Sequence, residues 1–319
     1  VTVGADSLKF EGIERFHGTS GNDTIRASGA EIAPAHFDTP AHGLTVYAGD
    51  GNDHISGSAA DDVLDGGAGN DSIWAGEGHD FIQSSTGNDS ISGGAGNENI
   101  RWGLGDAHWH NPGNDTIYGA DGHDLINVWV TDGDTSGGHS APGGRVTIAS
   151  TRADGAFAGT ATVGTSNNGD TALLRFQGFE QGWTHEGDDT VSGANAKISG
   201  NIGFQWGTRW GNDMLTGSAG NDTLEGGEGR DTIEGGRGND LISANGDFYS
   251  WSAPADGDVD TLVFHAGFGH DTVLAFDTGL DILQFDRSMS YTAEETGRGT
   301  LLTFNTGDTI LLANVYDFI

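Results

Sequence analysis

A nine-residue spacing of acidic residues constrains this chain more than any other feature. The longest run, in which each acid follows the last by nine residues, comprises Asp53, Asp62, Asp71, Asp80, Asp89 and Glu98. Shorter runs with the same spacing are Asp115 and Asp124, and then Asp213, Asp222, Asp231 and Asp240. An aliphatic residue lies two positions after every one of these acids. A strict short period of this kind predicts a repeat architecture built from one small structural element.

Each repeat has a turn half and a strand half. Residues 66–74 read GGAGNDSIW and residues 226–234 read GGEGRDTIE. The six residues G-G-x-G-x-D form a turn, because glycine allows positive φ and close backbone approach. The next three form a very short strand whose central aliphatic side chain points inward. Two repeats make one coil, and only stacked coils bury a continuous core. We therefore expect an all-β parallel β-roll or β-helix.

Stacked turns also predict a metal site. They bring carboxylates and peptide carbonyls together along each edge of the stack, and Ca²⁺ prefers six to eight such hard oxygen ligands. Mg²⁺ fits less well, because it requires tight octahedral geometry. The candidate ligands are Asp23, Asp53, Asp62, Asp71, Asp80, Asp89, Asp115, Asp124, Asp189, Asp213, Asp222, Asp231, Asp240 and Asp271, with the turn glycines Gly49, Gly51, Gly67, Gly69, Gly76, Gly78, Gly94, Gly96, Gly220, Gly227, Gly229, Gly236 and Gly238.

The charge of the chain supports this expectation. The formal net charge is −34, and 47 carboxylates repel one another unless cations offset them. About ten Ca²⁺ ions would cancel roughly 20 of these charges. We therefore expect the metal-free chain to be largely unfolded and to fold in millimolar calcium. The same charge argues against a nucleic-acid partner, no apolar run is long enough for a membrane span, and the absence of Cys excludes thiolate metal sites.

The nonapeptide resembles the repeat of the RTX (repeats-in-toxin) family over residues 18–126 and 186–242. The resemblance implies a Ca²⁺ ion between turns on the same side of the roll, held by acids 18 apart such as Asp53 and Asp71. It also implies an extracellular protein exported by type I secretion machinery. Three departures from the motif are expected to weaken or reshape calcium sites: Glu98 in place of Asp, and the glycine-poor turns 57–62 and 84–89.

The chain is expected to contain two related halves. Similar apolar segments at 8–16 and 174–182 precede the two runs of repeats. We predict a first β-roll with its lead-in strand over 1–130, an irregular β connector and second lead-in over 131–185, and a second roll over 186–254. Residues 255–319 contain richer strands and are predicted to form a C-terminal β cap and secretion signal.

One loop and the tryptophans remain beyond the repeats. The loop 101–111 breaks the register, and its Asp106, His108 and His110 are candidates for acid–base catalysis or transition-metal binding; the simpler interpretation, which we favour, is a packed loop with solvated imidazoles. The candidate ligand-binding tryptophans are Trp74, Trp102, Trp109, Trp129, Trp206 and Trp210. If they point outward, their rings could stack on sugars; the alternative is that they cover joints between coils.

Three function classes follow from these features. The first is a secreted, calcium-folded protein that binds an extracellular polysaccharide or cell surface. The second is a polysaccharide-modifying enzyme (a lyase, epimerase or hydrolase) with its site on the roll or the 101–111 loop. The third is a calcium-dependent surface-layer or matrix protein. The sequence has neither H-E-x-x-H nor G-x-S-x-G, so the recognisable zinc-protease and lipase motifs are absent, and whether the chain is an enzyme stays open.

Overall fold

The fold consists of short strands in two compact units. The computed structural model describes residues 2–3, 6–7, 14–27, 42–103, 112–129, 143–164, 171–245, 257–316 and 318. Unit 1 comprises 1–133 and 160–181, and unit 2 comprises 134–159 and 182–319. The described residues contain no helix, and hence none of the length and apolarity that a membrane crossing requires.

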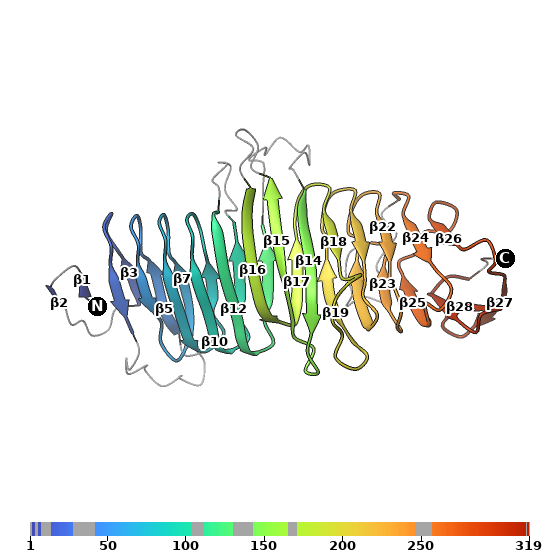
Figure 1. Ribbon diagram of the computed structural model, residues 1–319, viewed down its shortest axis with the longest axis horizontal. Coiled ribbons are helices and arrows are strands. Elements are labelled where there is room, and N and C mark those ends of the chain that lie inside the picture. The colour runs from blue at the N-terminus through green and yellow to red at the C-terminus, as the bar shows by residue number, and fades with distance from the viewer. Residues whose placement is uncertain are drawn as a thin grey trace. The chain divides into compact units, whose positions relative to one another are not determined.

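Unit 1 contains two sheets that the chain enters alternately (Figure 1). Sheet A of unit 1 consists of β1 (Thr2–Val3), β2 (Asp6–Ser7), β4 (Thr24–Arg26), β6 (His54–Ser56), β8 (Ser72–Glu77), β10 (Ser90–Gly96), β12 (Asn114–Gly122) and β16 (Thr171–Phe179). Sheet B of unit 1 consists of β3 (Arg15–His17), β5 (His42–Tyr47), β7 (Asp61–Asp65), β9 (Phe81–Gln83), β11 (Asn99–Trp102) and β13 (Leu125–Val128). Between β3 and β13, and between β12 and β16, the strand pairings of the described residues in unit 1 are parallel, while β1 pairs antiparallel with β2 and β4.

Unit 2 has the same alternation. Its sheet A consists of β14 (Gly144–Thr151), β18 (Thr190–Ser192), β20 (Met214–Thr216), β22 (Thr232–Glu234), β24 (Thr261–Phe264) and β26 (Ile282–Phe285). Its sheet B consists of β17 (Gln181–Thr184), β19 (Ile202–Gly207), β21 (Asn221–Glu225), β23 (Leu241–Ser243), β25 (His270–Leu274), β29 (Thr309–Ala313), β28 (Gly299–Phe304) and β27 (Tyr291–Thr296). β15 (Phe157–Gly164) contains the division between the units.

The aliphatic residue of each repeat forms the core. In sheet A of unit 1, parallel pairing places Ile25, Ile55, Ile73, Ile91 and Ile117 in one row, and all five are buried. The residues on either side of each isoleucine point outward, because successive side chains of a strand alternate between its faces. The expected all-β parallel roll is thereby confirmed.

The ends of the repeat runs differ in detail from the sequence expectation. The segment 174–179, expected to lead into the second roll, lies in β16 and pairs with β12 of unit 1. Strands β24, β25 and β26 continue the parallel stack of unit 2 in register, and only β27, β28 and β29 form an antiparallel closure. D-x-U triplets persist into this region, with turn glycines before Asp271 but not the full glycine motif before Asp260 and Asp281, which explains why the stack extends beyond the recognisable repeats.

Candidate calcium ladders

The glycine turns create a close-packed cradle around each acid. Gly67 and Gly69 have φ of 89° and 131°, and an added Cβ at Gly67 would lie 2.0 Å from the carbonyl oxygen of Gly49. A Cβ at Gly66 would lie 2.3 Å from Oδ2 of Asp71. Only glycine therefore fits beside Oδ2 of Asp71. Of the thirteen glycines singled out in the sequence, all except Gly220 have positive φ.

The acids form hydrogen-bonded ladders. The backbone N–H of each acid donates to a carboxylate oxygen of the acid in the next coil, for example from Asp53 to Oδ1 of Asp71 at 2.8 Å. In unit 1 these bonds link Asp23, Asp53, Asp71, Asp89 and Asp115, then Asp62 and Asp80, and then Glu98, Asp124 and Glu180. In unit 2 they link Asp189, Asp213, Asp231, Asp260 and Asp281, and then Asp222, Asp240 and Asp271. The pairs expected 18 residues apart are adjacent.

In many acids of the ladders the second carboxylate oxygen, Oδ2, has no hydrogen-bond donor. Oδ2 is buried and without a hydrogen-bond partner among the described residues in Asp53, Asp71, Asp80, Asp89, Asp240 and Asp271. Burial, and after it the neighbouring acids of each ladder, raise the pKa of Asp89 and of Asp271 to about 8. A buried, unpaired carboxylate oxygen is costly unless a cation occupies the space. The residues therefore fit Ca²⁺, which takes carboxylate and backbone oxygens.

The described residues contain no group of three or more His, Cys, Asp or Glu side chains placed to hold a metal ion among themselves. The ladder instead pairs carboxylates from neighbouring coils beside backbone carbonyls. This donor set consists only of hard oxygens, which again favours Ca²⁺ over zinc or copper.

Glu98 departs from its neighbours, as its longer side chain predicts. It is buried, and neither of its carboxylate oxygens has a hydrogen-bond partner within the described structure. Burial, followed by the proximity of Asp124, raises the pKa of Glu98 to about 9. Glu98 thus presents two unpaired oxygens where an aspartate presents one, so the substitution reshapes this rung.

Three acids at the start of a ladder have their own donors. Ser58 donates its backbone N–H to Oδ2 of Asp62 at 2.6 Å, and Ser218 donates likewise to Asp222 at 2.6 Å. In the third case the donor is Thr19 and the acceptor is Asp23 Oδ2, at 2.7 Å. In each turn the hydroxyl residue replaces the second glycine of the motif.

The turn 84–89 behaves differently, although it too has fewer glycines than the repeat motif. Ser85 adopts φ of 64°, the conformation of the glycine it replaces, and its hydroxyl donates to Asp65 at 2.7 Å. Oδ2 of Asp89 remains without a partner. A serine at the second turn position therefore does not by itself decide whether the acid is satisfied.

Several ladder residues escaped the sequence analysis. Asp260 and Asp281 lie at ladder positions of unit 2, and each is followed two residues later by a leucine of β24 or β26. That D-x-U triplet was the available signal, but the glycines that usually precede it are missing. The first glycine of the motif, such as Gly66, was also missed, although its position is closest to the carboxylate.

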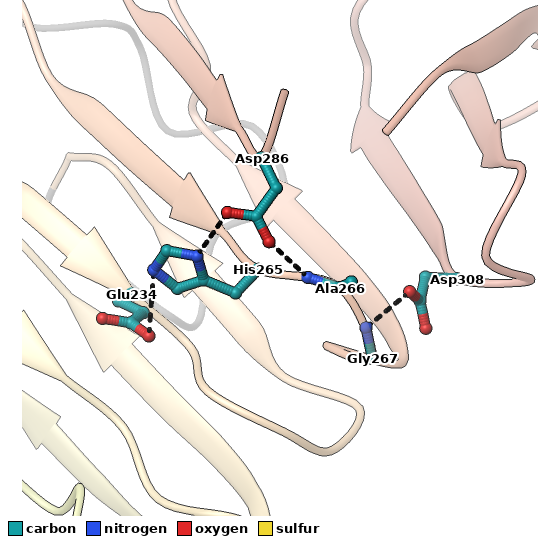
Figure 2. Close-up of polar contacts among 6 residues, drawn as sticks. All are labelled: Glu234, His265, Ala266, Gly267, Asp286 and Asp308. Carbon is teal, nitrogen blue, oxygen red and sulfur yellow. Dashed lines mark hydrogen bonds and ion pairs between the residues drawn. The ribbon is translucent and has the colours of Figure 1, made fainter. Parts of the chain in front are cut away.

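A surface cluster lies outside the ladders of unit 2 (Figure 2). His265 Nδ1 lies 2.9 Å from Asp286 Oδ1, and Nε2 lies 3.8 Å from Glu234. The hydrogen bond to Asp286 raises the pKa of His265. The adjacent Gly267 donates its backbone N–H to Asp308 at 2.9 Å.

The tryptophans are distributed differently from the expectation. Trp74 is exposed (61%), whereas Trp102 and Trp206 are fully buried. Of the two alternatives for the tryptophans, these two take the packed one, because Trp102 follows the core residue Ile100 by two positions and hence shares its inward face. Trp206 likewise follows the buried Phe204 by two.

The other candidate residues divide into two groups. Trp129 and Trp210 are partly exposed, and the Arg101 guanidinium lies 4.3 Å from the ring centre of Trp129. Asp106, His108, Trp109 and His110 lie outside the described residues.

Comparisons with known proteins agree with the ladders. A family model described as "RTX calcium-binding nonapeptide repeat (4 copies)" matches residues 10–30, 47–82, 74–106, 111–128 and 208–242. No curated protein matches the sequence significantly. The solved structure of the extracellular lipase LipA from Serratia marcescens aligns with 88% of this chain at 17% identity and a TM-score of 0.22. This chain covers 41% of that structure's chain, and so weak a likeness carries no argument about activity. The nonapeptides, their in-register coils and the family match together show that this chain contains RTX calcium-binding nonapeptide repeats.

Proposed function

We propose that this chain is an extracellular module that folds when it encounters calcium and then binds a polysaccharide. RTX repeats bind Ca²⁺ and are typical of proteins exported by type I secretion. The observation that carries the proposal is the set of buried ladder carboxylates whose Oδ2 lacks a hydrogen-bond partner. Extracellular calcium modules work at about 10⁻⁴–10⁻³ M Ca²⁺. A cytosol poorer in calcium would keep the chain unfolded and ready for export.

The chain's own residues account for the coupling between calcium and folding. The acids with an unpartnered Oδ2, together with the turn carbonyls, would hold the Ca²⁺ ions. The ions would supply positive charge and accept oxygen ligands. The glycines hold the turn backbone close to these acids, and the aliphatic rows exclude water from beneath them. Because the acids of one ladder come from different coils, the site exists only after the coils stack, so binding energy becomes folding energy.

The test is a calcium titration of the stripped chain followed by far-ultraviolet circular dichroism. We expect little β signal in chelator and a cooperative gain as free calcium approaches the millimolar range. A chain that shows the full β signal in chelator at neutral pH would contradict calcium-driven folding. A magnesium titration is the control, since Mg²⁺ tolerates this oxygen geometry poorly.

The polysaccharide surface that we propose is the outer face of sheet A in unit 1. Trp74 on β8 and Tyr118 on β12 are both exposed (61% and 44%) and both pair in register with Ser92 on the intervening β10. Two strand spacings separate them, or about 10 Å. This places two aromatic rings on either side of a small polar residue, an arrangement that suits stacking on alternate rings of an extended sugar chain.

The charge of this face supports an acidic or neutral glycan. Its two outward rows contain no carboxylate, although the chain carries 47. The rows are Thr24, His54, Ser72, Ser90, Thr116 and Arg175, and Arg26, Ser56, Trp74, Ser92, Tyr118 and Gln177. The acids lie in the turns at the edges, so the face itself would not repel a uronic-acid polymer.

Size-exclusion chromatography with light scattering tests this surface. The calcium-loaded protein is run with a panel of acidic and neutral polysaccharides. We expect co-elution with at least one glycan, lost in the Trp74→Ala, Tyr118→Ala double variant. The matched control is Met214→Ala, which removes an equally exposed apolar side chain (53%) from β20 of unit 2. Co-elution that survives the double variant, or no co-elution at all, would refute this surface. A glycan that shortens with time would favour the enzyme alternative. Large assemblies of the protein alone would favour the surface-layer or matrix alternative.

A further inference from the structure

We infer that calcium occupies the rungs whose second carboxylate oxygen has no donor, and that the chain closes the rungs of Asp23, Asp62, Asp115 and Asp222 with its own hydrogen-bond donors. The inference rests on the proposed calcium binding and adds which carboxylates take part. It removes Asp23, Asp62, Asp115 and Asp222 from the expected ligands, and it explains why one repeat motif gives two kinds of turn.

The first evidence comes from the starting rungs. Asp222 Oδ2 accepts the backbone N–H of Ser218 at 2.6 Å and its hydroxyl at 2.9 Å, while Oδ1 accepts the N–H of Phe204 at 2.7 Å. Both carboxylate oxygens are therefore satisfied. The same arrangement recurs at Asp62, whose Oδ2 accepts from Ser58 and whose Oδ1 accepts from Leu44 at 2.5 Å.

Backbone conformation explains the difference between rungs. Ser218 has no positive φ, and its N–H is directed at Asp222. In the next repeat on this ladder, Gly236 has φ of 99°, and Oδ2 of Asp240 has no donor. The residue at the second turn position thus presents its N–H to the carboxylate in one case and leaves space beside it in the other.

The finishing rungs of two ladders have donors of different origin. In unit 1, the indole N–H of Trp102 donates to Oδ2 of Asp115 at 2.5 Å, and both side chains are fully buried. In unit 2, the backbone N–H of Asp277 donates to Oδ2 of Asp281 at 2.7 Å. Asp308 lies two residues before Ile310, the register partner of Asp271, and accepts from Gly267 at 2.9 Å (Figure 2) and from Gly269 at 3.2 Å.

The physical reason is that each of these four acids has a neighbouring acid of its ladder on one side only, although the ladder ends at Asp189 and Asp271 keep an unpartnered Oδ2. A cation there would share fewer carboxylates, so its binding would offset less of the cost of burying the charge. A directed N–H satisfies the same oxygen without a cation.

The test compares two acids of one ladder. Calcium bound per folded chain is counted by equilibrium dialysis at saturating calcium for wild type, Asp222→Asn and Asp240→Asn. We expect Asp240→Asn to lose at least one ion and Asp222→Asn to lose none. Circular dichroism in the same buffer establishes that each variant is folded.

A third variant provides a gain rather than a loss. Ser218→Gly converts residues 217–222 into GGAGND, the complete repeat motif. It removes the hydroxyl donor and permits positive φ, so we expect one additional calcium ion per chain. This variant decides the question even if Asp222→Asn fails to fold.

The outcomes separate this inference from the proposed function. Equal losses in Asp222→Asn and Asp240→Asn, or no gain in Ser218→Gly, would overturn the inference while calcium binding stands. A wild-type chain that binds no calcium would instead overturn the proposed function.

Discussion

Proton binding should partly replace calcium in the metal-free chain. The perturbation is to strip calcium and then lower the pH from 8 toward 5. Burial, reinforced by neighbouring acids, raises the pKa of Asp89 from its ordinary value of 3.8 to about 8. In the metal-free fold at pH 7 this carboxyl is therefore protonated, whereas in the unfolded chain it is ionised. Unfolding releases the proton, so the stability of the metal-free fold falls as the pH rises from about 4 to 8.

The magnitude follows from the distance between the two pKa values. From pH 3.8 to pH 7 is about three pH units, and each unit costs about 1.4 kcal/mol. Asp89 alone then costs the metal-free fold about 4 kcal/mol at pH 7 and about 2 kcal/mol at pH 5. A typical domain has a total stability of only about 5–15 kcal/mol. A second rung with the same shift would therefore suffice to unfold the metal-free chain at neutral pH, and acidification should reverse part of that loss.

The assay is circular dichroism of calcium-stripped protein in metal-free buffers between pH 8 and pH 5, which stays above the isoelectric point of about 4.2. We expect the β signal to rise as the pH falls. In millimolar calcium the slope should have the opposite sign, because protons compete with Ca²⁺ for the same carboxylates. A stripped chain whose β signal is constant or falls on acidification would refute the assignment of buried, unpaired acids. Asp89→Asn tests the single rung, since it should raise the β signal of the stripped chain at pH 7.

Two further predictions concern the turns and the surface cluster. Gly67→Ala should lower stability in saturating calcium by about 1–3 kcal/mol, because its Cβ would meet the carbonyl of Gly49 at 2.0 Å. Gly155→Ala shares the positive φ but meets nothing within 4 Å, so its thermal denaturation should change less; equal losses would contradict the cradle. The pKa of His265, raised by Asp286, should return toward its ordinary value in Asp286→Asn, as measured by proton NMR titration. The stabilisation from the His265–Asp286 pair should be complete below pH 6.5 and disappear as the pH rises through the raised pKa of His265. An unchanged titration of His265 in Asp286→Asn would exclude the pairing.

The spacing of the acids determined most of this fold. A period of nine with an aliphatic residue two positions after each acid permits only short strands separated by tight turns, and the parallel roll follows because no single strand can bury its residue alone. The positions of the ladder aspartates within the nine-residue runs could be predicted for the same reason. Their neighbours in the ladder lie one coil away, and a strict period fixes the length of a coil.

The tertiary structure alone decided which oxygens are free. Whether Oδ2 of Asp222 or of Asp240 has a donor depends on the φ of the residue four positions earlier, and the conformation of Ser85 shows that residue type does not fix that angle. Trp102 reaches Asp115 across 13 residues through an inward face that the repeat pattern does not specify. The extension of the ladder through Asp260 and Asp281 was likewise hidden, because those coils keep the D-x-U triplet and replace the glycine turn. Local periodicity thus fixes the stack, whereas the hydrogen bonds of each rung depend on backbone angles and on contacts between coils, which no single repeat encodes.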